Sequence, residues 1–265
     1  AITAAALTGV NQTIFIQPGT YTENLTLVAG INLCAFVGDG TITPGSSNVI
    51  IFGKLTCTYT GTVDISGIEL RTNSDFGVES SGSNICYLNL YNCNINILNN
   101  TFLSSTNANF SFKFLNCTGN IATTGITLYS ITTGNTPKFI NCNFTNVGNS
   151  LTASTSASAH IYFYNCSITF PLTATSGILE AHFSVFEPQT GATCINLGAG
   201  GGVHLITHCS LISATNSVIV LTTVSLIIAN CFIQNQIGAA AISGTGTLTY
   251  SGLTLFGHGI GSFMY

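Results

Sequence analysis

The phrase Asn-Cys returns at regular intervals and constrains the fold more than any other feature of this chain. Its complete copies are Asn92-Cys93, Asn116-Cys117, Asn141-Cys142, Asn165-Cys166 and Asn230-Cys231, while His208-Cys209 keeps the phrase with His in place of Asn. The first four copies are roughly 24 residues apart, and a repeat in the low twenties is typical of solenoids. In a solenoid each repeat buries its apolar side only against its neighbours.

Three degenerate copies extend the repeat towards both ends of the chain. They are His182-Phe183-Ser184-Val185, Ser66-Gly67-Ile68 and Ser251-Gly252-Leu253. We align each by its second residue with the Cys of the complete copies. This alignment places His182 beside His208 in the column that Asn occupies elsewhere.

Equivalent positions of a parallel stack point the same way on strands about 4.8 Å apart, so one residue type forms one column. We expect the Cys to be reduced and to stack inward, because a disulfide needs convergent side chains. We expect the Asn amides to hydrogen-bond along the stack at a bend. The predicted structural ladder contains Asn92, Cys93, Asn116, Cys117, Asn141, Cys142, Asn165, Cys166, His208, Cys209, Asn230 and Cys231.

The composition narrows the functional classes. Charged residues are 5% of the chain and hydrophobic residues 46%, which is not a disordered composition. Four Lys plus Arg cannot form a basic stripe, so nucleic-acid binding is not expected. The longest apolar run, Val218 to Ile233, is interrupted by polar residues and shorter than a membrane span, so no membrane insertion is expected. Zinc-binding Cys spacings are missing, so we expect neither a metal nor a cofactor.

The N-terminal region carries a recognisable pattern. Ala-rich residues 1–10 predict the last turns of a helix, and they precede the phrase Ile-x-Pro-Gly-x-Tyr-x-Glu-Asn-x-x-Leu at Ile16–Leu27. Over residues 1–34 the chain resembles the opening coil of the pectin-lyase-like right-handed parallel β-helix superfamily. The resemblance implies an all-β, single-stranded, right-handed parallel β-helix of about ten rungs. We expect an N-terminal cap remnant over 1–12 and the β-helix over 13–265.

The resemblance implies a fold shared by enzymes and structural proteins. The low charge and the Ser, Thr and Asn content look most like β-helical segments of phage or viral fibres. That implies a non-enzymatic, receptor-binding rod on a virion or extracellular surface, forming a homo-oligomer, most simply a trimer, or packing laterally. Surface glycans are the expected ligands, through loops such as 148–160 and 186–202. The alternatives are a carbohydrate-active enzyme and an extracellular bacterial adhesin rod.

Two fragments bear on the enzyme alternative. Gly257-His258-Gly259 matches one motif of polygalacturonases, but their other motifs are missing. The dense charge cluster Asp64, Glu69, Arg71, Asp75 and Glu79 predicts solvated charges on an outer face, with a saccharide site as the alternative. We assign no catalytic residue, and the candidate binding residues are Glu69, Arg71, Asp75 and His258.

Overall fold

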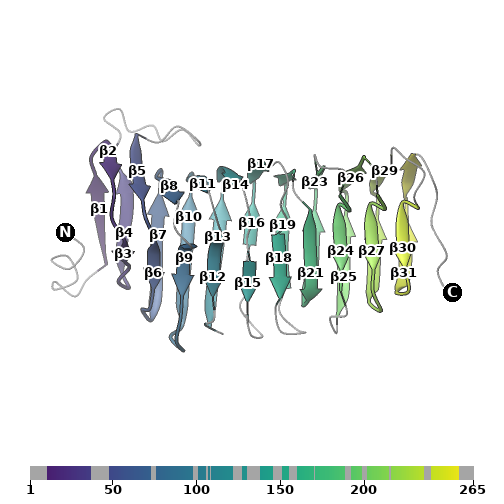
Figure 1. The fold of residues 1–265 in the computed structure, drawn as a ribbon, viewed down its shortest axis with the longest axis horizontal. Coiled ribbons are helices and arrows are strands. Elements are labelled where there is room, and N and C mark those ends of the chain that lie inside the picture. Colours follow the sequence, from purple (N-terminus) through teal and green to yellow (C-terminus); the bar gives the residue numbers. More distant parts are fainter. Residues whose placement is uncertain are drawn as a thin grey trace.

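The chain forms a straight rod of stacked coils (Figure 1). This computed structural model describes residues 11–36, 48–72, 76–97, 101–105, 107, 109–121, 127–129, 138–145, 151–154, 160–169, 171–188, 192–198, 202–214, 216–235 and 240–256. Every strand pairing among these residues is parallel, with non-consecutive strands as neighbours. The described part of the chain is therefore a β-solenoid, and the predicted fold class is confirmed.

Two sheets run the full length of the rod. Sheet A contains β1 (Gln12–Ile16), β4 (Ile31–Ala35), β7 (Gly61–Ser66), β10 (Cys86–Tyr91), β13 (Phe110–Leu115), β16 (Lys138–Ile140), β19 (His160–Tyr164), β22 (Ile178–His182), β25 (Val203–Thr207), β28 (Ser225–Ala229) and β31 (Thr247–Ser251). Sheet B contains β2 (Gly19–Tyr21), β5 (Val49–Phe52), β8 (Glu69–Thr72), β11 (Asn94–Ile97), β14 (Thr118–Ile121), β17 (Asn143–Thr145), β20 (Ser167–Ile168), β23 (Val185–Phe186), β26 (Ser210–Ser213), β29 (Phe232–Asn235) and β32 (Thr254–Phe256).

The third side of the coil is divided into two shorter sheets. Sheet C contains β3 (Leu25–Thr26), β6 (Leu55–Cys57), β9 (Phe76–Ser80) and β12 (Thr101–Ser105). Sheet D contains β15 (Thr127–Tyr129), β18 (Leu151–Ser154), β21 (Leu172–Ser176), β24 (Ile195–Leu197), β27 (Ile219–Leu221) and β30 (Ile242–Gly244). We call each turn of chain a rung and number the rungs from β1 to β31.

Sheets A and B have 11 strands each, slightly more than the ten rungs expected. The predicted capping helix over residues 1–10 lies outside the described residues, which themselves contain only strands and connections.

Alternation along each strand fills the inside of the coil. In β13, for example, Phe110, Phe112 and Phe114 point inward while the residues between them are partly exposed. Rings from adjacent rungs then pack together, and Phe139 stacks on Phe163 with centroids 4.7 Å apart. The core is therefore aromatic in rungs 5 to 8 and mainly aliphatic in the rungs on either side.

The corner between sheets A and B confirms the predicted Asn ladder. Asn92, Asn116, Asn141 and Asn165 have φ of 51–53°, a left-handed conformation that Asn tolerates better than most residues. Each amide of the last three donates to the Asn one rung earlier, over 3.3, 3.1 and 3.0 Å. One residue type thus supplies both the bend and the bonds between rungs.

The Cys column also matches the prediction. All ten Cys are free thiols, and Cys93, Cys117, Cys142, Cys166, Cys209 and Cys231 are buried. From Cys117 onward, each thiol donates to a carbonyl one rung earlier, as Cys166 does to Phe139 O over 3.3 Å. The contact with Cys117, followed by burial, raises the pKa of Cys142 to about 12. This thiol therefore stays protonated and acts as a small apolar residue.

The alignment of the degenerate copies is wrong by one residue. Phe183, with φ 50°, holds the Asn position and Ser184 the Cys position, while His182 lies in β22 opposite Tyr164. Gly67 and Gly252, with φ 67° and 58°, likewise hold the Asn position. The physical reason is the left-handed corner, which Gly and Asn adopt easily. Alignment by backbone conformation would have placed these copies correctly.

Candidate functional site

The charge cluster seen in the sequence is divided among three sheets. Asp64 lies on sheet A, Glu69 and Arg71 on sheet B, and Glu79 on sheet C, where it pairs with Lys54 at 2.5 Å. The structure therefore does not bring these charges together as one site.

Glu69 is held by its neighbours on sheet B. Its Oε1 accepts a hydrogen bond from Arg71 Nε over 2.6 Å and another from Asn96 Nδ2 over 2.8 Å. The residue is 6% exposed, so the expectation of a solvated charge is wrong here. Its carboxylate has little surface left for a ligand. Asp75 and His258 lie outside the described residues.

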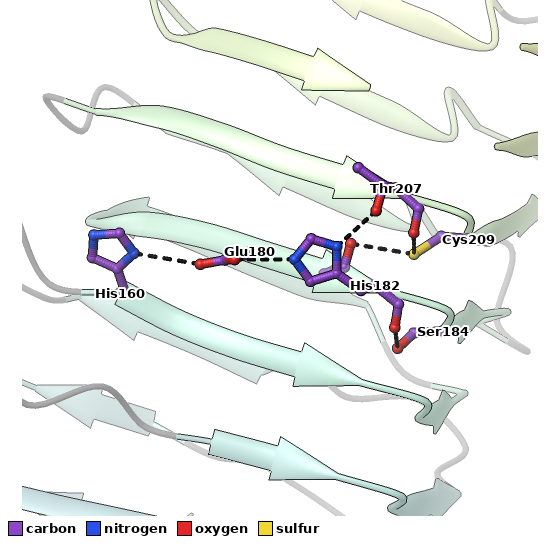
Figure 2. Close-up of polar contacts among 7 residues, drawn as sticks. His160, Glu180, His182, Ser184, Thr207 and Cys209 are labelled. Atoms are coloured by element: carbon purple, nitrogen blue, oxygen red, sulfur yellow. Dashed lines mark hydrogen bonds and ion pairs between the residues drawn. The ribbon is translucent and has the colours of Figure 1, made fainter. Parts of the chain in front are cut away.

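A different row of polar side chains crosses the outer face of sheet A in rungs 7 to 9. Glu180 lies between two imidazoles, with Oε1 3.0 Å from His182 Nε2 and Oε2 3.8 Å from His160 Nδ1. His182 Nδ1 lies 2.6 Å from Thr207 Oγ1. Figure 2 shows the row running from His160 through Glu180 and His182 to Thr207 across three neighbouring strands.

Aromatic rings surround this row. The side chains of Tyr162 and Tyr164 point to the same side of β19. Their ring centroids are 6.4 Å apart, and the ring planes are almost parallel, with an angle of 8° between them. Tyr162 also lies 5.7 Å from the ring of His182, and Tyr164 lies 5.5 Å from Phe183. Burial, followed by the nearby Glu180 carboxylate, raises the pKa of Tyr162, so its hydroxyl remains a donor. We call Tyr162, Tyr164, Glu180, His182 and His160 the aromatic face.

The alternating pattern that forms this face is visible in the sequence, as His160-x-Tyr162-x-Tyr164 and Ile178-x-Glu180-x-His182. Apart from His182, no motif in the sequence marks these residues. The paired segments are 18 residues apart along the chain, and only the stack brings them side by side. The period-2 signal could have placed each triplet on one side of a strand. It could not have shown which rungs are adjacent.

The hydrogen-bonded order of Glu180, His182 and Thr207 is that of an activated nucleophile with its base and orienting acid. Acyl transfer also requires backbone N–H groups free to stabilise an oxyanion. Here the N–H of His208 donates to Ala229 O over 3.0 Å, and that of Cys209 to Cys231 Sγ over 3.4 Å. The backbone N–H groups of the two residues that follow Thr207 are therefore already hydrogen-bonded and are not free to stabilise an oxyanion.

Glycoside hydrolysis needs two carboxyl groups about 5–9.5 Å apart. Among the described residues, the other carboxylate on sheet A is Asp64, five strands away from Glu180, or about 24 Å at the spacing of β-strands. Glu187 follows β23 on sheet B, beyond the corner. The aromatic face therefore offers one carboxylate to a ligand.

Metal binding, membrane spanning and a hollow in the first rungs also bear on the function of the described residues. No group of three or more His, Cys, Asp or Glu is arranged to hold a metal ion. No helix there has the length and hydropathy to cross a membrane. A hollow of about 690 Å³ is lined by Ile14, Tyr21, Leu25 and Leu33 among others, and it belongs to the first rungs of the core, far from the aromatic face.

Comparison with known proteins gives little beyond this geometry. No family model matches the chain, and no curated protein matches it. Among solved structures, the chain is similar to the catalytic unit of a thermostable GH87 α-1,3-glucanase from Streptomyces thermodiastaticus, with 11% identity and a TM-score of 0.39. The match covers 96% of this chain and 65% of the glucanase chain, so this chain spans less than two thirds of that length.

Proposed function

We propose that the chain is a non-enzymatic β-helical rod that binds surface glycans, as a receptor-binding segment of a phage or viral fibre does. Its place would be a virion or another extracellular surface. The stiffness of the rod supports a display role, because continuous strand ladders, the Asn ladder and the stacked core all run along its axis. A rigid scaffold holds a binding face in fixed geometry.

The aromatic face is the observation that carries the proposal. Tyr164 is 39% exposed, and the side chains of His160 and Glu180 are 43% and 32% exposed. Aromatic side chains present a large apolar surface with a polar tip, which suits the apolar faces and hydroxyl rims of sugar rings. Glu180 and the imidazoles supply acceptors and donors for those hydroxyls. A single carboxylate on this face is sufficient for binding.

Binding of the whole protein to immobilised bacterial surface polysaccharides tests the proposal. We expect Tyr162→Ala with Tyr164→Ala to weaken binding at least about tenfold, as loss of central aromatic anchors does elsewhere. Tyr87→Ala is the matched control, because Tyr87 is exposed on the same sheet at β10, three strands away. Equal binding by the double variant and the wild type would refute the assignment of this face.

A hydrolase is the second candidate, and the order of Glu180, His182 and Thr207 is what favours it. Incubation with polygalacturonate and with the same polysaccharides, with and without calcium, should release no reducing ends, unsaturated products or acyl groups. Product formation that His182→Gln abolishes would replace the binding proposal with the enzyme. An adhesin rod would instead bind glycans of a host cell in the same assay.

A further inference from the structure

Two of the four basic residues of the chain lie next to each other on sheet A. Lys113 in β13 is paired in register with Lys138 in β16, and Figure 1 shows these two strands side by side. Both side chains point outward, because they alternate along their strands with Phe residues that are buried in the core. The outer face therefore carries two positive charges one strand spacing apart, about 4.8 Å.

No carboxylate neutralises this pair of charges. The other two basic residues of the chain each form an ion pair with a glutamate. Among the residues that the structure describes, neither Lys113 nor Lys138 forms one, and Lys113 lies instead 5.9 Å from the ring of Tyr91. Like charges directly opposite on neighbouring strands destabilise a sheet. A bound anion would relieve this repulsion.

The two lysines lead directly onto the aromatic face. Lys138 is paired in register with Tyr162, and Tyr162 with Glu180. We call Lys113, Lys138, Tyr162 and Glu180 the charged column, since they follow one another on four successive strands of sheet A. These strands span about 14 Å, which is the length of a short oligosaccharide. One glycan lying along the rod axis can therefore contact the whole column.

We infer that the charged column selects a glycan in which an acidic sugar is joined to neutral sugars. This inference rests on the proposed function and names the class of glycan that the aromatic face binds. The ammonium groups of Lys113 and Lys138 bind the anionic substituent, a carboxylate or an ester-linked sulfate or phosphate, because charge-assisted hydrogen bonds are stronger than neutral ones. The adjoining neutral sugar packs on Tyr162 and Tyr164, with its hydroxyls at Glu180.

The rest of the column disfavours a glycan that carries an acid on every sugar. Beyond Lys138 the column reaches Glu180, and the next two strands carry Leu205 and Ile227 at the same position. A second acidic sugar would therefore meet no lysine there, and the Glu180 carboxylate would repel it. The imidazole of His182 hydrogen-bonds to this carboxylate and, when neutral, leaves its negative charge in place. Acidic and neutral sugars are thus expected to alternate.

Binding of the whole protein to matched polysaccharides tests this inference. The probes are bacterial capsular polysaccharides in which a uronic acid alternates with neutral sugars, the carboxyl-reduced form of each, and alginate, which has a carboxylate on every sugar. We expect the alternating acidic polysaccharides to bind at least about tenfold more tightly than their reduced forms and than alginate. Carboxyl reduction leaves sulfate and phosphate esters intact, so a capsule that binds equally after reduction and carries such an ester identifies the ester as the ligand.

The lysines are tested by variants that remove one charge and keep the length of the side chain. Lys113→Met and Lys138→Met should each weaken binding of the acidic polysaccharide at least about tenfold and abolish its advantage over the reduced form. Lys54→Met is the matched control, because it changes the net charge equally but lies between β5 and β6, paired with Glu79. Glu180→Gln should strengthen the binding of alginate, since it removes the repulsion.

These outcomes separate this inference from the proposed function. If both lysine variants bind the acidic polysaccharide as the wild type does, the charged column is not part of the site and this inference alone is wrong. Equal weakening by Lys54→Met and Lys138→Met would attribute the effect to net charge and would also overturn it. If the wild type binds none of the probes, the proposed function fails as well.

Stability and salt provide two further measurements. Lys113→Met and Lys138→Met should unfold at urea concentrations no lower than the wild type does, because each relieves the repulsion between like charges. Should either variant fail to fold, the wild type still decides. Raising the salt from about 0.05 M to about 0.5 M should weaken its binding to the acidic polysaccharide but not to the reduced form, and equal binding of the acidic form at both salt concentrations would contradict the inference.

Discussion

Rungs 3 to 7 and rungs 8 to 11 share one backbone but differ in their side chains. In the first region the outer face of sheet A is polar, as where Asn89 donates to Asp64 over 2.8 Å and Lys113 lies 5.9 Å from the ring of Tyr91. In the second region the same column carries Glu180 in rung 8 but Leu205 and Ile227 in rungs 9 and 10. The inward columns are mainly apolar in both regions, with a few buried polar side chains such as His204 and Ser184 among them. The inside of the coil thus specifies the fold, and the outside is free to differ in function.

The core offers the largest test of this comparison. The Phe139 ring contacts four other Phe rings, one of which is its stacking partner Phe163. Phe139→Ala should therefore lower the free energy of unfolding by about 3–5 kcal/mol. Phe183→Ala, at a ring 51% exposed, should cost far less. Urea denaturation measures both. Similar losses for the two variants would show that the aromatic core is not what stabilises the middle rungs.

Acid should destabilise the second region through His204. This residue is fully buried in β25, its Nδ1 accepts from Leu179 N over 3.0 Å, and its Nε2 has no partner among the described residues. Burial lowers its pKa from 6.5 to about 4. The unfolded chain therefore takes up the proton first, so stability is full above pH 6.5 and falls as the pH drops to about 4.

The loss over that range should reach at most about 3 kcal/mol. His204→Leu should remove it, and the control His160→Gln, on the outer face, should not. Urea midpoints measured from pH 7 to pH 4 provide the check. If the His204→Leu variant lost stability with falling pH as steeply as the wild type does, the acid sensitivity would lie at another residue.

Much of the fold was predictable from sequence because it depends on local patterns. Asn-Cys spacing, inward alternation and the opening phrase at Ile16–Leu27 each reflect a requirement of one rung, and the stack repeats it. His204 was visible by the same alternation between Val203 and Leu205, although it was not singled out. The aromatic face was not predictable, because pairing His160 with Ile178 depends on loop lengths that vary between rungs.

The regular corner of the first region should be sensitive to its Asn residues. Asn141 has φ 52° and hydrogen-bonds to Asn116 and Asn165. Asn141→Ala should lose about 2 kcal/mol, because Ala is strained in the left-handed region and cannot continue the ladder. Asn141→Gly relieves the strain and should lose less. Equal losses would show that the ladder, and not the backbone conformation, stabilises the corner.

The smallest effect is expected where the second region departs from that corner. Phe183 adopts φ 50°, which strains a bulky residue by about 1–2 kcal/mol. The Phe183 ring stacks on the His208 ring, with centroids 4.8 Å apart. This contact contributes about 0.5–1.5 kcal/mol and so offsets part of the backbone strain.

Phe183→Asn should therefore stabilise the protein by less than about 1 kcal/mol, since it removes the strain and extends the amide ladder from Asn165 towards His208. Phe183→Gly is the control that removes strain without adding an amide, so the difference between the two variants isolates the ladder. Thermal denaturation of both variants gives the measurement. A clear destabilisation by Phe183→Asn would mean that rung 8 is stabilised by the aromatic contacts of Tyr164, Phe183 and His208 and not by an amide ladder.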